Sequence, residues 1–265
     1  MRSSLLLLSA ASLLAQVMTP TALQAASPSS CSSLSPGRYA VWDMGVLKES
    51  GSLSTPTARL FEERWLPGGR VEGSVVERVG KEGRRGSYSG SVSLSKNCVA
   101  VVQRQLPWGP ERTEVVLDGR GRPLYGLIRQ EKQVITSSWL PMASGSCRSS
   151  DLNGLVLSRQ TGLNASSGGG WVPNAVVQRE QWKDGKVQGL ALASYGGHGE
   201  SAGYSGELKL DPGSCWGSLV EKDQFGVTYN YWALIVNGRK DKGARGYLYL
   251  QRDPGNLTAA WLVRD

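Results

Sequence analysis

The chain has 265 residues, among them 34 glycines, 9 tryptophans, 4 cysteines and 1 histidine. A single histidine cannot supply a multi-histidine metal site, and it argues against a Ser/His/Asp or Cys/His catalytic apparatus. The 30 Lys and Arg against 22 Asp and Glu give a formal charge of +8, and 40% of the residues are hydrophobic, which is typical of a folded chain rather than a disordered one.

The first 25 residues have the pattern of a secretory signal peptide. Arg2 supplies a positive start, residues 5–14 form an apolar run, and small residues lead to a cleavage site after Ala25. The apolar run is shorter than a comfortable membrane span. We therefore expect a secreted or periplasmic protein whose mature chain begins with an exposed segment over residues 26–36.

The mature chain carries an internal duplication. Residues 69–95 and 185–211 align without a gap, with an offset of 116 positions, and nine of the 27 pairs are identical. They include a Gly-x-Val-x-Gly string at 69–73 and 185–189 and a Tyr-Ser-Gly string at 88–90 and 204–206. The shared offset is the observation that favours duplication over chance placement of turn glycines.

The four cysteines follow the same offset. Cys31 and Cys147 are 116 positions apart, and Cys98 and Cys215 are 117 apart. An even number of cysteines in an exported protein indicates disulfides, for which four cysteines allow three pairings. Duplication favours Cys31–Cys98 and Cys147–Cys215, one bridge in each half. No C-x-x-C motif occurs, so we expect neither a redox nor a metal role and no cofactor.

The remaining pattern predicts an all-β fold. Short segments alternate with period two between Gly-rich turns such as Gly68-Gly69 and Asp184-Gly185, and helical periodicity is absent beyond the signal. In the first half we predict strands near 38–44, 57–66, 70–78, 86–94, 98–105, 112–118, 123–129 and 132–139. In the second half we predict strands near 154–159, 172–182, 186–195, 203–210, 215–221, 226–236, 244–250 and 257–264.

Eight antiparallel strands in about 115 residues fit a small up-and-down barrel or a strongly curved sheet. We expect a first barrel repeat over residues 37–142, a linker over 143–150 and a second repeat over 151–265, in a monomeric protein. A single fused sheet is the alternative architecture.

Each half resembles a group of secreted bacterial proteins of unassigned function. The resemblance rests on an opening Cys31 followed by Gly37-Arg38-Tyr39, then on residues 69–73 and 88–90, and on Cys98. The second copy departs at Gly154, which no aromatic residue follows. The resemblance covers about 70 residues per half and implies a calycin-like barrel, as in the broad lipocalin group, without assigning any functional residue.

Paired carboxylates are the candidates for an enzyme, which we keep as an alternative acting on a sugar or small lipid-like substrate. The nearest pairs are Glu62 with Glu63 and Glu72 with Glu77. Adjacent strand residues point to opposite faces, so Glu62 and Glu63 are not expected to converge. No catalytic residue is assigned on this basis.

Basic residues at predicted turns form a second candidate site. They would attract an anionic polysaccharide or a membrane surface, whereas we do not expect nucleic acid as a partner of an exported protein. Ordinary solubilising charge is the alternative interpretation. The candidates are Arg84, Arg85, Arg120, Arg122, Arg239, Lys240, Lys242 and Arg245.

Aromatic residues crowd the last third of the chain and form the third candidate site. Inside a barrel they would line a cavity for a small apolar or sugar ligand, and the alternative is core packing. The candidates are Tyr229, Tyr231, Trp232, Tyr247 and Tyr249. We therefore expect an exported binding or structural protein, with the carboxylate enzyme and an outer-membrane-associated barrel as the alternatives.

Overall fold

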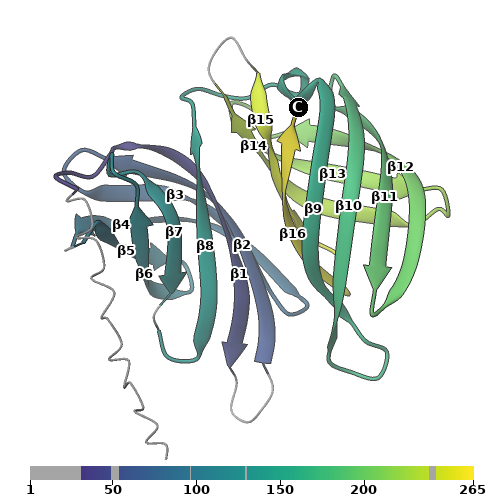
Figure 1. Ribbon diagram of the computed structural model, residues 1–265, viewed down its shortest axis with the longest axis horizontal. Coiled ribbons are helices and arrows are strands. Elements are labelled where there is room, and N and C mark those ends of the chain that lie inside the picture. The colour runs from purple at the N-terminus through teal and green to yellow at the C-terminus, as the bar shows by residue number, and fades with distance from the viewer. Residues whose placement is uncertain (1–30, 49–53, 96, 129, 239–242) are drawn as a thin grey trace, which may run out of the picture.

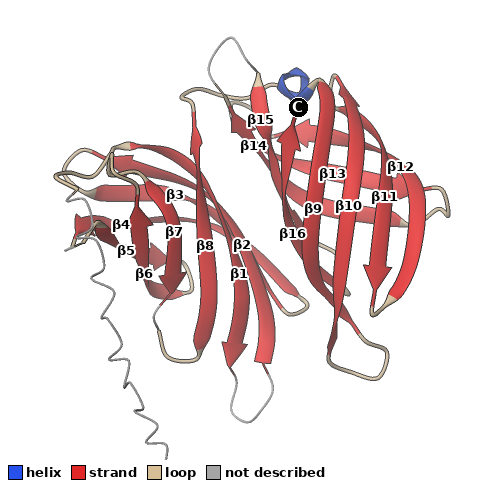
Figure 2. Ribbon diagram, in the orientation of Figure 1, coloured by secondary structure: helices blue, strands red, loops and turns tan. Residues whose placement is uncertain are grey.

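The computed structural model describes residues 31–48, 54–95, 97–128, 130–238 and 243–265. The expected signal peptide, residues 1–25, lies outside the described residues. The described chain folds into two closed antiparallel barrels of eight strands each, which confirms the predicted fold class (Figure 1). Apart from one short 3-10 helix, η1 (Ser149–Leu152), the regular elements of the described residues are strands (Figure 2).

The first barrel contains β1 to β8 in sequence order. Its strands are β1 (Gly37–Lys48), β2 (Ser54–Leu66), β3 (Arg70–Val79), β4 (Glu82–Leu94), β5 (Val99–Leu106), β6 (Gly109–Leu117), β7 (Pro123–Ile128) and β8 (Gln133–Met142). Strand β1 pairs with β2 on one side and with β8 on the other, which closes the sheet on itself.

The second barrel repeats this arrangement after η1. Its strands are β9 (Gly154–Ala165), β10 (Trp171–Lys183), β11 (Lys186–Tyr195), β12 (His198–Leu210), β13 (Trp216–Asp223), β14 (Thr228–Asn237), β15 (Ala244–Gln251) and β16 (Asn256–Arg264). Here β9 pairs with both β10 and β16. The observed order of strands is therefore the same in the two halves, as duplication requires.

The tight turns between β2 and β3 and between β10 and β11 have the expected chemistry. Gly68 and Gly69 both have positive φ, and so do Asp184 and Gly185. Asp184-Gly185 is the two-residue loop of a type I′ hairpin between Lys183 and Lys186, which needs positive φ at both positions, whereas residues 67–69 form a three-residue loop between Leu66 and Arg70. The duplicated turn thus uses the residue types that its backbone demands.

Both disulfides have the pairing that the repeat predicts. Cys31 is bonded to Cys98 and Cys147 to Cys215, so each barrel carries its own bridge from the segment before its first strand to the start of its fifth strand. Two bridges indicate an oxidising, extracytoplasmic environment, because cytosolic thiols are kept reduced.

The two barrels share an apolar core. Ala40, Ala58 and Leu60 point away from the interior of the first barrel and are nevertheless fully buried. They belong to the same apolar cluster as Leu248 and Leu250 of β15. Strand β2 accordingly lies beside β15 and β16 (Figure 1).

Polar contacts also cross between the barrels. The Arg78 guanidinium donates hydrogen bonds to the backbone carbonyls of Gln251 and Asp253, at 3.2 and 3.0 Å. The Trp216 indole N–H donates to Ser74 Oγ at 2.8 Å. These directional contacts fix the orientation of one barrel on the other.

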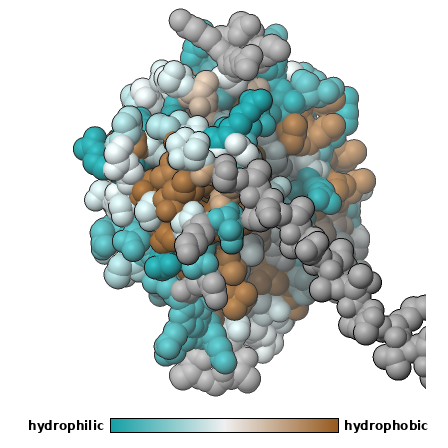
Figure 3. Space-filling model, turned by 60° about the vertical axis from the view of Figure 1, so that its left-hand side comes forward, coloured by the Kyte–Doolittle hydropathy of each residue, from teal (hydrophilic) through white to brown (hydrophobic). Residues whose placement is uncertain are grey.

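The outer surface away from this interface keeps some exposed apolar side chains. Figure 3 shows apolar residues gathered within a mostly hydrophilic face of the molecule. On β6 to β8, Val116, Leu127 and Val134 are 54, 43 and 63% exposed. Within the described residues, no helix is long and apolar enough to cross a membrane.

Candidate functional site in the barrel interiors

A buried glutamate with aromatic donors is repeated inside both barrels. In the first barrel, Glu63 accepts hydrogen bonds from the indole N–H groups of Trp65 and Trp139 and from the Tyr88 hydroxyl, at 2.8, 3.0 and 2.8 Å. It also forms an ion pair with Arg104, whose Nε lies 2.6 Å from Glu63 Oε2. Glu63 is therefore a fully satisfied carboxylate.

The equivalent glutamate of the second barrel keeps two of the aromatic donors, because Trp182 and Tyr204 match Trp65 and Tyr88, but it has no arginine. Glu180 accepts hydrogen bonds from Trp182 Nε1 at 2.7 Å and from the hydroxyls of Tyr204 and Tyr247, at 2.8 and 2.9 Å. Burial outweighs these hydrogen bonds and raises the pKa of Glu180.

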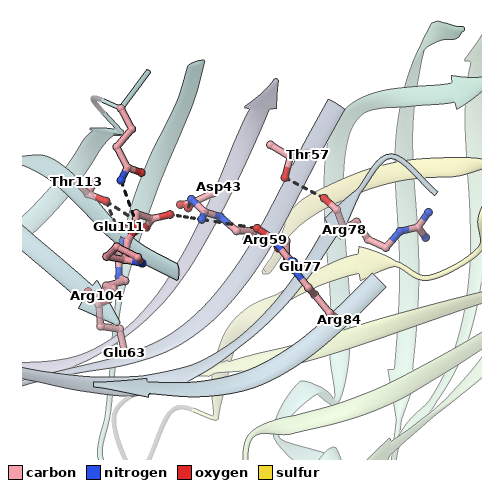
Figure 4. Close-up of polar contacts among 12 residues, drawn as sticks. Asp43, Thr57, Arg59, Glu63, Glu77, Arg78, Arg84, Arg104, Glu111 and Thr113 are labelled. Carbon is pink, nitrogen blue, oxygen red and sulfur yellow. Dashed lines mark hydrogen bonds and ion pairs between the residues drawn. The ribbon is translucent and has the colours of Figure 1, made fainter. Parts of the chain in front are cut away.

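The first barrel is filled by an ionic network centred on two arginines (Figure 4). The Arg104 side chain is fully buried, and its Nη1 lies 2.9 Å from Glu111 Oε1 and 3.0 Å from Thr113 Oγ1. Arg59 contacts Asp43 at 2.5 Å and also bonds Glu111. The guanidinium groups thus hold neighbouring carboxylates inside the barrel as ion pairs.

The pKa values in this network reflect a balance between burial and the contacts with arginine and hydrogen-bond donors. Burial by itself raises the pKa of Glu63 and Glu111, but their arginine neighbours more than offset it and hold both pKa values below the ordinary value. For Asp43, burial dominates the attraction of Arg59, and its pKa is raised. This arrangement is a packed polar core, in which Asp43 Oδ1 and Arg104 Nη2 also have no hydrogen-bond partner among the described residues.

The second barrel instead holds a small cavity of about 50 Å³ near one end. That end is formed by the turns that join β11 to β12 and β13 to β14. A cavity of this size has room for about three to five water-sized groups. Its polar and aromatic lining consists of Gln160, Gln178, Tyr195, Glu200, Tyr204, Glu221, Asp223, Tyr229, Tyr231, Tyr249, Gln251, Asn256 and Thr258.

Glu221 is the most unusual member of this lining. It is 3% exposed, and its Oε1 has no hydrogen-bond partner among the described residues. Burial, together with the charge of Glu180, raises the pKa of Glu221 well above its ordinary value. A buried carboxyl oxygen without a partner is costly, and this one belongs to a residue that lines the cavity.

Register-equivalent positions explain why one barrel is filled and the other is hollow. Arg59 pairs with Asp43 across β1 and β2, and the equivalent pair across β9 and β10 is Val176 with Gln160. Arg104 lies opposite Gly90, and the residue opposite the equivalent Gly206 is Glu221. At these positions the second barrel has lost both guanidinium groups and the carboxylate of Asp43, and it has gained the carboxylate of Glu221.

An arginine is also replaced by a glutamate at one end of the second barrel. Arg84 lies opposite Glu77 and bonds it, and its guanidinium covers the Trp108 ring at 4.1 Å. The equivalent pair of the second barrel is Glu200 with Ala193, and both residues line the cavity. Replacement of the Arg84 side chain, together with that of Glu77, leaves this end open.

Four of the five predicted aromatic residues lie inside the second barrel. Tyr229, Tyr231 and Tyr249 line the cavity, and Tyr247 bonds Glu180. Trp232 is on the opposite face of β14, where it packs against the core shared by the barrels, and the Arg252 guanidinium lies 5.3 Å from its ring centre. Because side chains alternate along a strand, Trp232 lies on the other face of β14 from Tyr229 and Tyr231.

Four of the described basic candidate residues contact acidic or carbonyl oxygens. Arg85 pairs with Asp211 at 2.9 Å, and Arg122 pairs with Asp118 at 2.6 Å. Arg245 donates to a backbone carbonyl, and Arg120 is exposed on the turn between β6 and β7. The others are Arg84, which bonds Glu77, and Arg239, Lys240 and Lys242, which lie outside the described residues.

The carboxylate pairs considered from the sequence do not converge. Glu63 points into the first barrel, whereas Glu62 points outward and pairs with Arg38 at 2.9 Å. Glu77 is buried, whereas the Glu72 side chain is half exposed on the outer face. Sequence reasoning missed Glu180 and Glu221, although the offset of 117 that relates Cys98 to Cys215 also relates Glu63 to Glu180 and Arg104 to Glu221.

Comparison with known proteins identifies no family. No protein-family model matches the chain, and no curated protein matches it. Among solved structures, it is similar to a "putative AttH" from Nitrosomonas europaea, with 9% identity and a TM-score of 0.26 over 86% of this chain and 92% of the other. It is also similar to a porin-like protein from Bacteroides uniformis, with 7% identity and a TM-score of 0.23 over 87% and 98%. Likeness at this level carries no argument about function.

Proposed function

We propose that the protein is an exported, non-catalytic binding protein that holds a small ligand in the end cavity of its second barrel. The observation that carries the proposal is Glu221 Oε1, a buried atom without a hydrogen-bond partner among the described residues, in a cavity lined by tyrosines and amides. The filled first barrel then serves as a structural partner, packed against the outer face of the binding barrel.

A calycin-like origin suits this proposal. Members of the lipocalin group hold one small ligand inside an eight-stranded up-and-down barrel. The two closed barrels, each with its own disulfide, are compatible with that architecture in an exported protein. The small volume of the cavity favours a ligand that inserts only a polar head group, with the rest of the molecule outside the barrel.

Alanine methyl groups offer a direct test of binding. Ala191, Ala193 and Ala202 line the cavity, whereas Ala40 and Ala58 are buried between the barrels. In protein labelled at alanine methyl carbons, a ligand from an unbiased screen should shift the NMR signals of the first three residues and leave those of the other two in place. If no compound in a broad library moves the cavity methyl signals, the proposal is wrong.

An acid–base enzyme is the second candidate, because Glu200, Glu221 and Asp223 all line the same cavity. Burial raises the pKa of Glu221, which suits a proton donor. The cavity is too small for a sugar ring, however, so binding is the function that the geometry supports better. Hydrolysis of a panel of chromogenic glycosides and esters, lost in Glu221→Gln, would reverse this preference.

A further inference from the structure

We infer that the ligand of the second barrel carries a primary ammonium group, which occupies the space that arginine guanidinium groups fill in the first barrel. This inference rests on the proposed function and specifies the chemical class of its ligand. It depends on the charges at equivalent positions, on the size of the cavity and on the donors and acceptors that line it.

The interiors of the two barrels differ in the charge of their side chains. The first barrel balances the carboxylates of Asp43, Glu63, Glu77 and Glu111 with Arg59, Arg84 and Arg104, so these side chains sum to 3 − 4 = −1. The second barrel has Glu180 in its interior and Glu200, Glu221 and Asp223 around the cavity, and no described lining residue is Arg or Lys, so with every carboxyl counted as ionised its formal sum is 0 − 4 = −4. The binding barrel therefore lacks the cations that its duplicate contains.

The cavity lies at the positions where the first barrel has the guanidinium groups of Arg59 and Arg104. Glu221 stands where Arg104 stands in the first barrel, and Val176 stands where Arg59 stands. Val176 and Glu221 both line the cavity, which consequently lies in the volume of the lost guanidinium groups. A ligand cation at this place would restore the ion pairing that stabilises the interior of the first barrel.

The size and chemistry of the lining define the kind of cation. An ammonium group is about as large as a water molecule and donates three hydrogen bonds, which suits a cavity of about 50 Å³ with carboxyl, amide and hydroxyl acceptors. The rings of Tyr195, Tyr229 and Tyr231 add faces that attract cations and pack on an aliphatic stem. The described residues contain no cluster of three or more His, Cys, Asp or Glu side chains with the arrangement of a metal site.

Protonation should be coupled to binding. The pKa of Glu221 is raised by burial and by Glu180, and the ammonium group would favour its ionised form, so binding should release a proton at neutral pH. The other titratable side chains that face the same interior are Glu180, Tyr195, Glu200, Tyr204, Asp223, Tyr229, Tyr231, Tyr247 and Tyr249. Calorimetry in two buffers of different ionisation enthalpy measures this release.

The test compares butylamine with 1-butanol, which has the same number of heavy atoms and no charge. Butylamine should shift the methyl signals of Ala191, Ala193 and Ala202 at a concentration at least tenfold lower than 1-butanol. Glu221→Gln keeps the shape of the side chain, removes its charge and should abolish that preference. Retention of the tenfold preference in Glu221→Gln would overturn the inference.

A second pair of variants tests the equivalence of the two barrels. Val176→Arg installs the arginine of the first barrel at its register position, where it should pair with Glu221, fill the cavity and abolish butylamine binding. Val177→Arg is the matched control, because Val177 is 48% exposed on the outer face of the same strand, and it should bind butylamine like the unmodified protein. Unchanged binding in a folded Val176→Arg variant would contradict the inference.

The outcomes also separate this inference from the proposed function. If the cavity methyl signals respond to neutral or anionic compounds and not to amines, binding in the barrel stands and the ammonium inference is wrong. If they respond to no compound, the proposed function itself is wrong.

Discussion

Replacement of Arg104 by methionine should strongly destabilise the protein. The guanidinium contacts Glu63 at 2.6 Å, Glu111 at 2.9 Å and Thr113 at 3.0 Å, and the side chain is fully buried. Methionine retains most of the apolar stem but leaves the two carboxylates with fewer partners. Loss of one partner from a buried ion pair costs about 3–5 kcal/mol.

Equilibrium urea unfolding measures this loss. If the free energy of unfolding depends on urea with a slope of about 2 kcal/mol/M, the midpoint should fall by about 2 M. Arg112→Met is the control, because Arg112 pairs with Glu114 at 3.5 Å on the surface, and this change should cost less than about 1 kcal/mol. If the two variants lose the same small amount, the buried network does not contribute as argued.

Three further predictions concern pH, disulfides and the barrel interface. Because the folded-state pKa of Glu221 is raised, the free energy of unfolding should fall as pH rises above the unfolded-state pKa of about 4.3. In urea titrations from pH 4 to 8, Glu221→Gln should show a smaller fall than the unmodified protein. Identical pH profiles for the two proteins would contradict this. Replacement of Cys147 and Cys215 by alanine opens a loop with a separation of 68 residues and should cost about 4 kcal/mol, seen in calorimetry as a Tm lower by about 8–16 °C; a change below about 2 °C would disagree. Ala58→Arg places a charge in the apolar interface between the barrels and should separate them. The radius of gyration from small-angle scattering should rise, while the strand signal in circular dichroism stays unchanged. Unchanged scattering would mean that the apolar interface does not hold the barrels together.

Most of the fold follows from local features of the sequence. The offset between Cys31 and Cys147 and between Cys98 and Cys215 predicts both disulfides, and period-two alternation with Gly-rich turns predicts eight strands per half. Because these features are local or repeated, they can be recognised in the sequence without knowledge of the tertiary structure. The packing of one barrel on the other was not predicted. Ala58 and Leu60 flank Arg59 in the sequence, and this alternation does not show that the outward face of β2 is covered by the second barrel.

The candidate site was predicted only in part. Alternation places Tyr229 and Tyr231 on one face, and this face proves to be the interior. Alternation does not show which face of a strand is interior when the interior face carries charged residues. Arg59 and Arg104 therefore have the sequence pattern of surface residues, although both are buried. Glu221 becomes meaningful only when the register of the two barrels shows that it replaces an arginine.

Closure of both barrels limits how another protein can recognise this one. Each barrel joins its first strand to its last, so within the described residues neither sheet presents a row of unpaired backbone groups to an incoming strand. A partner has to bind through side chains and loops, and the same closure protects the exported chain against edge-to-edge aggregation. Proteolytic attack should likewise fall first on the turns between strands, because the backbone of the strands is held in continuous hydrogen-bonded rings.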